Sequence, residues 1–316
     1  MTDGLNPFTF ACPVCQARLS QMTPDELCCP QDGRTYARRD GIWRFLAPEV
    51  EAYYQRFIRE YETIRQAEGR GIPQAAYYRA LPDRDLSGHF SVDWRVRAAS
   101  YSAFVAQVLR PHANGDRLKI LDLGAGNGWL SNRLAGFGHF LAAVDLTTSE
   151  LDGLGAYVHY TNRFLPVQAD FNHLPFTDGD IDLVIFNASF HYSTGYEATL
   201  GEALRVLQPG GQVVILDSPV YRTAASGEAM VREREALFQR RYGFPSNAIP
   251  SENFLTYQRL DVLAETLGLR WEAFAPHYEL SWRIRRWLAR LRSGRELARF
   301  MVIAGRRSEQ GTSVLL

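Results

Sequence analysis

The sequence predicts an α/β protein with a mostly parallel sheet that is covered by helices on both faces. From Leu118 onward, short apolar or β-branched runs alternate with segments of ten or more residues that have helical character. This alternation is typical of parallel sheets, because each crossover between parallel strands needs a helix-length connection. The runs at 183–186 and 213–216 are almost wholly hydrophobic, as expected for strands buried on both faces.

Two smaller parts precede this α/β domain, which we assign to residues 113–316. Residues 1–47 combine all four cysteines with short alternating runs and are expected to form a small β module. Residues 48–112 are expected to form a helical cap or linker, because apolar side chains recur there at helical spacing. Within this part, residues 69–88 are broken by glycines and prolines, which predicts a loop.

The α/β domain itself is expected to contain strands at 118–123, 140–145, 165–169, 181–187 and 212–217. The helix after the second strand is expected to begin at the capping-box pattern of residues 147–150. Residues 219–253 are polar and proline-containing, which predicts an insertion. The last strands are expected at 270–274 and 300–304, with a tryptophan- and arginine-rich helix at about 281–297 between them.

Composition argues against several classes of protein. Of the 316 residues, 46% are hydrophobic, and Lys plus Arg equals Asp plus Glu at 35 each. This balance argues against a surface that neutralises many phosphates along a nucleic acid. We expect no signal peptide, because the first ten residues mix polar side chains with Pro7, and no membrane span, because no apolar stretch is long enough. All cysteines lie between Cys12 and Cys29, which indicates one local site in a reducing, cytoplasmic setting; the sequence does not indicate an oligomeric state.

The strongest local signal is a glycine-rich turn after the first strand of the α/β domain. Gly124, Gly126 and Gly128 lie between this strand and an expected helix. Glycines let the backbone approach a ligand closely and adopt conformations that a Cβ would forbid. The dinucleotide-binding pattern needs its third glycine one place later, where this chain has Trp129. The turn therefore predicts a ligand site similar to a dinucleotide-binding site but with a different spacing of the glycines.

Polar residues follow the next three strands at the same edge of the sheet. Asp145 closes the second strand, 21 residues after Gly124 (145 − 124), and can accept hydrogen bonds from both hydroxyls of a ribose. The alternative is that Asp145 only caps a helix. Asp170 follows the third strand and Asn187 ends the fourth, while residues 204–213 form a helix end, a Pro-Gly-Gly turn and a further strand.

In order and spacing, these blocks resemble the class I (Rossmann-like) S-adenosylmethionine-dependent methyltransferases, and in particular the type 11 methyltransferase domain, over about residues 90–305. The resemblance implies a seven-stranded sheet whose last strand is antiparallel, and S-adenosylmethionine as cofactor. The cofactor-binding residues that it implies are Asp122, Gly124, Gly126, Asn127, Gly128, Asp145, Leu146, Asp170, Phe171 and Asn187.

Within this set, the resemblance implies a separate role for each end of the cofactor. Gly124, Gly126 and the backbone around them would face the methionine part, and Asn187 would lie beside the methyl group. Asp145 would bind the ribose. Leu146 would pack on the adenine, whose edge Asp170 and the Phe171 amide would contact.

The four cysteines follow a metal-binding pattern. Cys12-Pro-Val-Cys15 has the spacing of a zinc knuckle, and residues 27–33 have the shape of a second one. The segment resembles the zinc-ribbon-like module found with some methyltransferases and as a separate methyltransferase-activator protein. The last cysteine of that pattern is an aspartate here. Either zinc is bound by Cys12, Cys15, Cys29 and Asp32, with Cys28 as an alternative ligand, or the ribbon persists without metal.

Methyl transfer from a sulfonium depends mostly on alignment, because the donor is already activated. If the acceptor must lose a proton, His191 is the candidate general base, since it follows the fourth strand; otherwise it packs in the pocket. Neutral charge and aromatic helical flanks favour a small-molecule or lipid-type acceptor. An RNA methyltransferase is the alternative, in which phosphates would be bound by Arg283, Arg285, Arg286, Arg290, Arg292 and Arg295. A non-catalytic cofactor- or partner-binding protein is the third reading.

Overall fold

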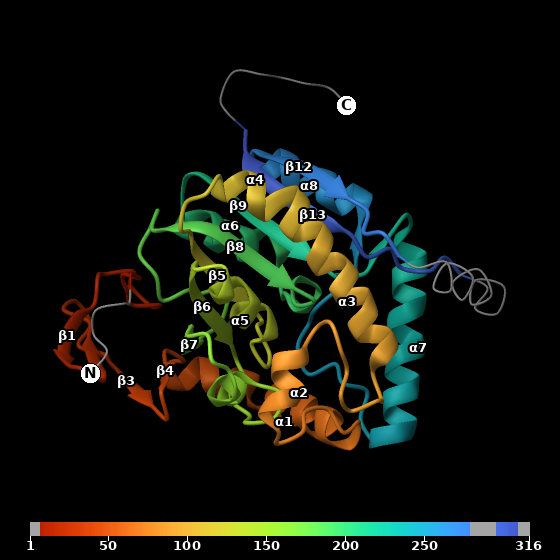
Figure 1. Cartoon of the computed structure of the whole chain (residues 1–316), viewed down its shortest axis with the longest axis horizontal. Coiled ribbons are helices and arrows are strands. Elements are labelled where there is room, and N and C mark those ends of the chain that lie inside the picture. Colours follow the sequence, from red (N-terminus) through yellow and green to blue (C-terminus); the bar gives the residue numbers. More distant parts are fainter. Residues whose placement is uncertain (1–6, 279–294, 309–316) are drawn as a thin grey trace.

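The computed structural model describes residues 7–278 and 295–308, and its centre is a single large β-sheet (Figure 1). The order of the eleven strands is β1-β2-β3-β4-β7-β6-β5-β8-β9-β13-β12 within these residues. Their bounds are β1 (Ser20–Thr23), β2 (Glu26–Cys28), β3 (Thr35–Arg39), β4 (Ile42–Arg44), β5 (Lys119–Leu123), β6 (Phe140–Asp145), β7 (Leu165–Gln168), β8 (Ile181–Asn187), β9 (Leu207–Leu216), β12 (Leu269–Phe274) and β13 (Val302–Arg307).

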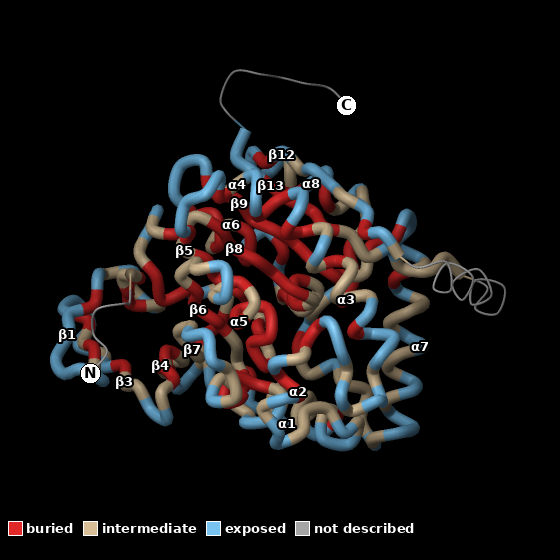
Figure 2. The backbone as a smooth tube through the Cα atoms, in the orientation of Figure 1, coloured by how far each residue is buried: buried red, intermediate tan, exposed pale blue. Residues whose placement is uncertain are grey.

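The seven strands from β7 to β12 form the predicted sheet of the α/β domain. β5 to β9 are parallel, whereas β13 runs antiparallel to both of its neighbours, β9 and β12. Every residue of β8 except Asp182 is buried, as its hydrophobic sequence predicts. Figure 2 shows β5, β6, β8 and β9 as the most buried part of the molecule. The predicted fold class is confirmed.

Helices pack on both faces of this sheet, and the sheet separates two hydrophobic cores. One core joins the sheet to α6 and α8, and the other joins it to α3, η1 and α5. The bounds of the helices are α1 (Pro48–Ala67), α2 (Ala75–Ala80), α3 (Ser91–Phe104), η1 (Val105–Leu109), α4 (Arg110–Ala113), α5 (Trp129–Gly136), η2 (Leu154–His159), η3 (Phe190–Tyr192), α6 (Tyr196–Val206), α7 (Ala224–Tyr242) and α8 (Tyr257–Leu267). β10 (Val220–Tyr221) and β11 (Leu255–Thr256) form a separate parallel pair.

The cysteine-bearing stretch extends one edge of the sheet. β4 pairs with β7 in parallel, through Trp43 with Val167 and Arg44 with Gln168. Phe10 and Trp43 belong to the same core cluster as Leu121 of β5 and Val144 of β6. Figure 1 shows β1 to β4 beyond β7 at this edge. The stretch therefore shares both a sheet and a core with the α/β domain.

Two local expectations differ from the structure, and the predicted insertion gains a helix. No helix begins at residues 147–150, because the Thr147 carbonyl oxygen accepts from the Leu154 N–H at 3.1 Å, and the Leu151 N–H that would start a helix is donated to the Ser149 hydroxyl; the short helix η2 follows instead. The stretch expected as a loop at 69–88 contains α2, and the expected insertion at 219–253 consists largely of α7.

The helix expected at about 281–297 lies mostly outside the described residues, as do Arg283, Arg285, Arg286, Arg290 and Arg292. In the part of the chain that is described, no helix has the length and apolar character of a membrane span.

Candidate active site

A glycine-rich turn between β5 and α5 forms the floor of the candidate site. Gly124, Gly126 and Gly128 have φ angles of +72°, +55° and +78°, a region that residues with a side chain rarely adopt. A Cβ at Gly124 would lie 2.3 Å from the Cβ of Ser189, so only glycine fits there. A Cβ at Gly126 would meet only the Asp152 carbonyl oxygen, at 3.9 Å. At Gly126 the backbone therefore borders open space that a ligand can enter.

Asp145, the last residue of β6, is bonded to this turn. Its Oδ2 accepts a hydrogen bond from the Gly126 N–H at 2.8 Å, and its Oδ1 accepts one from the Thr147 N–H at 2.9 Å. Burial raises the pKa of the Asp145 carboxyl to about 6, although both hydrogen bonds act to lower it. Above that pH the carboxylate is ionised, and each oxygen can accept a second hydrogen bond. Asp145 can thus bind hydroxyl groups while it orders the turn.

A cavity lies between the ends of these strands and α1. From the sheet side it is lined by Gly124, Asp145, Leu146, Thr147, Phe171, Ala188 and Ser189. From α1 it is lined by Tyr54, Phe57, Ile58 and Tyr61. Apolar and aromatic walls of this kind suit a flat ring such as adenine.

Polar contacts fix α1 to the loop after β6. Arg65 Nε lies 3.2 Å from Asp152 Oδ2, and the Thr147 hydroxyl donates to Glu62 Oε1 at 2.6 Å. Arg65 also donates to the Tyr61 hydroxyl at 2.5 Å. These contacts hold Tyr61 over the site, so α1 forms its cover.

A second cavity continues from the turn toward the end of β8. It shares Tyr61, Gly124 and Ala188 with the first cavity. Its other lining residues are Arg65, Arg70, Tyr77, Trp94, Arg97, Ala125, Gly126, Asn127, Trp129, Asp152 and Asn187. Because the two cavities meet over Gly124, one elongated ligand can lie across both.

Three of the predicted site residues lie outside the linings of these two cavities. Asp170 is buried, accepts a hydrogen bond from the Asn172 N–H at 3.0 Å and lies 2.9 Å from Nδ1 of His173. Asp122 is fully buried below the turn, and Gly128 packs against Phe164. The structure therefore brings seven of the ten predicted cofactor residues to the cavities: Gly124, Gly126, Asn127, Asp145, Leu146, Phe171 and Asn187.

Asp122 has an unusual environment for an acidic group. Its Oδ2 accepts from the Ser131 hydroxyl at 2.8 Å, whereas its Oδ1 is buried with no hydrogen-bond partner among the described residues. Burial raises the pKa of the Asp122 carboxyl to about 7, and the charge of Asp145 adds to this rise. Asp122 therefore links β5 to α5 and lies outside the two cavities.

His191 lies in η3, directly after β8. Its Nδ1 is 3.3 Å from the Ser218 hydroxyl. Burial lowers the pKa of His191 to about 3, and the charges of Arg234 and Arg97 lower it further. The imidazole is therefore neutral near pH 7 and is a weak base, which favours a role in shaping the pocket over general-base catalysis.

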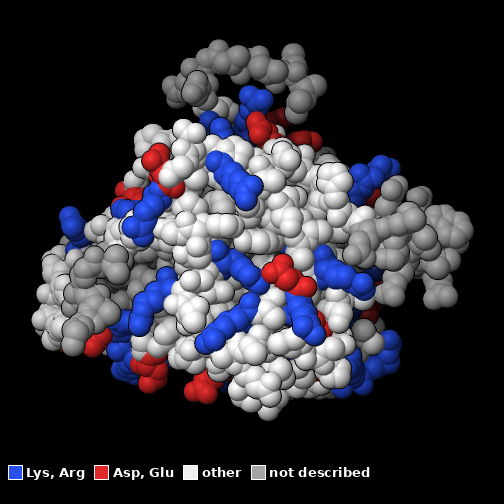
Figure 3. All heavy atoms as spheres, viewed as in Figure 1, with Lys and Arg blue, Asp and Glu red and all other residues white. Residues whose placement is uncertain are grey.

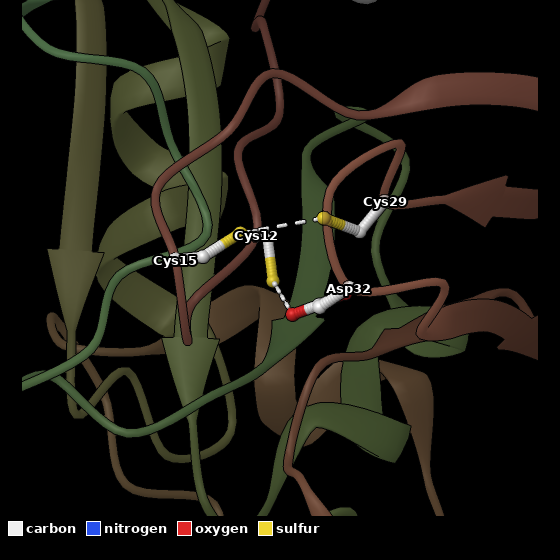
Figure 4. Close-up of side chains that lie close together, drawn as sticks. All are labelled: Cys12, Cys15, Cys29 and Asp32. Carbon is white, nitrogen blue, oxygen red and sulfur yellow. Dashed lines mark hydrogen bonds between the residues drawn. The ribbon is translucent and has the colours of Figure 1, made fainter.

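The cysteine-bearing stretch gathers four side chains around one point, as Figure 4 shows. The ligand atoms of Cys12, Cys15, Cys29 and Asp32 all lie within 4.8 Å of one another. A tetrahedral zinc ion with Zn–S bonds of about 2.3 Å places its ligand atoms roughly 3.8 Å apart, so this cluster matches its dimensions. Cys28 is not part of the cluster, because its thiol is directed to the Cys29 carbonyl oxygen.

Sequence reasoning missed the basic wall of the second cavity and Asp152. Arg65 follows Tyr61 by four residues, so both lie on the face of α1 that covers the site. That spacing was a usable signal for Arg65. No comparable signal marks Arg97 or Asp152, because their place in the site depends on how distant elements pack.

Comparison with known proteins identifies the kind of domain to which this site belongs. Residues 121–215 match the family model of a methyltransferase domain. The demethylmenaquinone methyltransferase of Thermus thermophilus is 35% identical over 191 residues, which cover 57% of this chain and 76% of that protein. A malonyl-[acyl-carrier protein] O-methyltransferase of Erwinia pyrifoliae is 35% identical over 107 residues, 34% of this chain and 40% of that protein.

The chain spans about two fifths of the length of several relatives, including the Erwinia enzyme and, at 38%, an arsenite methyltransferase of Aquipseudomonas alcaligenes. A solved structure of a geranyl diphosphate methyltransferase is 15% identical, with a TM-score of 0.45, and covers 61% of this chain and 71% of that one. A likeness this weak carries no argument about function. The domain match and the extent of the Thermus relative show that the chain belongs to the class I S-adenosylmethionine-dependent methyltransferases.

Proposed function

We propose that this chain transfers a methyl group from S-adenosylmethionine to a small-molecule or lipid-type acceptor. The observation that carries the proposal is the pair of cavities that meet over Gly124. Asp145 lies in the first and Asn187 in the second, so one bound cofactor can reach from the ribose contact to the end of β8. Two relatives are named for demethylmenaquinone and for malonyl-[acyl-carrier protein], which supports an acceptor that is a small molecule, a lipid or a group held on a carrier protein.

The residues of the site divide the work of binding and alignment. Asp145 would bind the ribose, and Leu146 and Phe171 would pack on the adenine. Gly124 and Gly126 would let the methionine part lie against the backbone. The cofactor, when bound, supplies a methyl group already activated on sulfur, so the protein's task is to hold the acceptor in line and to exclude water. α1 is placed to exclude water, since it covers the first cavity with Tyr54, Phe57, Ile58 and Tyr61.

A transfer assay with a methyl-labelled donor tests this function. Purified protein is incubated separately with a metabolite extract, a lipid extract and total RNA. Label is expected in the metabolite or lipid fraction. It should fall sharply in the Asp145→Ala variant but persist in Asp261→Ala, which changes an exposed acid on α8. Label that enters RNA alone would instead support an RNA methyltransferase. Cofactor binding without transfer to any of the three fractions would favour a non-catalytic protein.

We also propose that Cys12, Cys15, Cys29 and Asp32 bind one structural zinc ion. Three sulfur donors and one carboxylate are a ligand set that zinc accepts, and the four donors already converge. Elemental analysis of native protein should find about one equivalent of zinc. A Cys12→Ser/Cys15→Ser variant should lose it, whereas Cys28→Ser should retain it. Native protein without metal would leave the metal-free ribbon as the correct interpretation.

A further inference from the structure

One wall of the second cavity carries two polar side chains that lack a bonding partner. Both come from α3: Trp94 is buried and Arg97 is partly buried. The Trp94 Nε1 has no hydrogen-bond partner among the described residues, since the nearby Tyr77 hydroxyl lies outside hydrogen-bonding geometry. A buried indole N–H is normally bonded, because a buried donor without an acceptor is costly. The Trp94 donor is therefore left for a ligand to satisfy.

The charge of Arg97 is only partly balanced. Its guanidinium lies 4.9 Å from the centre of the Trp94 ring and forms no hydrogen bond or ion pair with the residues that the structure describes. Burial lowers the pKa of Arg97, and the charges of two neighbouring arginines lower it further. Asp217 and Asp152 act in the opposite direction but do not outweigh these effects. Since an unbalanced buried charge is costly, an anion at this place would stabilise Arg97.

The other charged groups around this cavity are engaged with one another. Arg65 Nε lies 3.2 Å from Asp152 Oδ2. Arg70 forms ion pairs with acidic residues that do not line the cavity. Asp217, at the end of β9, accepts a hydrogen bond from the Ser100 hydroxyl at 2.5 Å. One positive charge of the lining is thus left for a ligand to neutralise.

Trp94 and Arg97 lie at the opposite end of the paired cavities from the ribose contact. Asp145 lines the first cavity, whereas Trp94 and Arg97 line only the second. Trp129, the first residue of α5, packs against Trp94, with ring centres 5.9 Å apart and ring planes at 90°. This contact places Trp94 beside the glycine-rich turn. A cofactor whose ribose is bound by Asp145 would therefore extend its amino-acid end toward Trp94 and Arg97.

The charge on the outer surface favours the same orientation. Figure 3 shows Lys and Arg side chains gathered around α2 and α3, the helices that carry Tyr77 and Arg97. A positive field of this kind attracts the cofactor's carboxylate and repels its sulfonium. The ammonium group beside the carboxylate has an acidic neighbour in Asp152, which lines the same cavity.

We propose that Arg97 and the Trp94 N–H bind the carboxylate of the cofactor's methionine part. This inference rests on the proposed methyltransferase function and names the residues that hold one end of its methyl donor. Both lie outside residues 121–215, which match the family model, so the helical cap supplies part of the binding site. With the ribose at Asp145 and the carboxylate at Arg97, the sulfur lies between them, over Gly124, where the two cavities meet.

Two ligands that differ only in the carboxylate test this assignment. Binding of S-adenosylmethionine and of decarboxylated S-adenosylmethionine is measured by titration calorimetry on the full chain, without an acceptor. The parent protein should bind S-adenosylmethionine more tightly. Arg97→Gln should weaken binding of S-adenosylmethionine by about tenfold or more, as expected for a lost charge-assisted pair, and should change binding of the decarboxylated ligand by less than about twofold.

A second variant tests the indole donor. Trp94→Phe removes the N–H but keeps an aromatic ring, so it should also weaken only S-adenosylmethionine, by less than Arg97→Gln does. Two controls should bind both ligands as the parent does: Arg84→Gln, an exposed arginine after α2, and Trp271→Phe, which removes an indole N–H on β12. If Arg97→Gln does not fold, Arg97→Lys and Trp94→Phe decide, since each should lose affinity for S-adenosylmethionine alone.

Two outcomes would overturn the proposal. If the parent protein binds both ligands equally, the carboxylate is not recognised. If Arg97→Gln and Trp94→Phe weaken both ligands to the same extent, these residues only shape the cavity.

A failure of the proposed function would look different. The chain would then prefer S-adenosylmethionine over its decarboxylated form but transfer no label to any fraction. Conversely, transfer of label by a protein without this preference would refute the carboxylate site and leave the proposed function standing.

Discussion

Replacing Asp145 with alanine is the most direct test of the cofactor site. The carboxylate accepts one hydrogen bond from Gly126 and one from Thr147, and each oxygen retains capacity for a ribose hydroxyl. Hydrogen bonds to a charged group contribute about 1.5–3 kcal/mol. Asp145→Ala should therefore weaken binding of S-adenosylhomocysteine by roughly 10- to 150-fold, at about 1.4 kcal/mol per tenfold.

The structure makes this a lower bound, because the substitution also frees the Gly126 N–H that now orders the turn. Asp145→Asn separates the two effects. Its amide oxygen can still accept from one backbone N–H, but its amide nitrogen then faces the other. We expect a smaller loss of affinity for Asn than for Ala.

The assay is titration calorimetry at pH 8, with circular dichroism to show that each variant is folded. Asp261→Ala on α8 is the control and should bind as the parent does. A folded Asp145→Ala protein whose affinity lies within about twofold of the parent would refute the ribose role, since even one neutral hydrogen bond contributes about 1 kcal/mol.

Three further predictions follow from the same site and from the cysteine cluster. Gly126→Val should abolish cofactor binding, because the new side chain enters the cavity. It should lower the stability by only about 1–2 kcal/mol, the cost of a side chain at a φ of +55°. Calorimetry measures the first effect and thermal melting the second. Cofactor affinity should fall as the pH drops below 6, because the pKa of Asp145 is raised to about 6 and its ionised form accepts both ribose hydroxyls. The loss of affinity should reach roughly tenfold at pH 5. It should be absent in Asp145→Asn, which has no group that titrates at this position. Removing zinc by the Cys12→Ser/Cys15→Ser change should lower the melting temperature and increase hydrogen exchange in residues 7–47, and Cys28→Ser should do neither.

The fold and the centre of the site could be predicted because their signals are local. β5, the glycine turn and α5 follow one another without interruption, and each glycine has the positive φ that its residue type permits. Asp145 ends β6 beside this turn because parallel neighbours place their carboxyl ends at the same edge. The order of the five expected strands from 118–123 to 212–217, with the residues that follow them, is sufficient to predict the sheet.

A helical cap or linker at residues 48–112 could be predicted, but not the bonds that fix it over the site, because these join distant parts of the chain. Tyr61 and Arg65 have the spacing of any amphipathic helix, and nothing local indicates that Arg65 reaches Asp152. The wrong helix start at 147–150 has a local cause. Thr147 has the residue type of a helix cap, but its carbonyl oxygen accepts from the Leu154 N–H, and the Leu151 N–H is donated to the Ser149 hydroxyl. The chain therefore closes into a turn where the pattern predicts a helix.

The cysteine stretch shows how such distant contacts can link two sites. The sequence predicts a small module beside the α/β domain, yet β4 adds directly to β7 through Gln168. The Gln168 side chain accepts from Arg44 at 3.1 Å and donates to the Leu146 carbonyl oxygen at 2.9 Å. The backbone carbonyl oxygen of Gln168 accepts from the Phe45 N–H. Leu146 lines the first cavity. Loosening residues 7–47 would therefore remove partners from Gln168 and disturb the adenine end of the site, while the turn at Gly124 would keep its own bonds to β6.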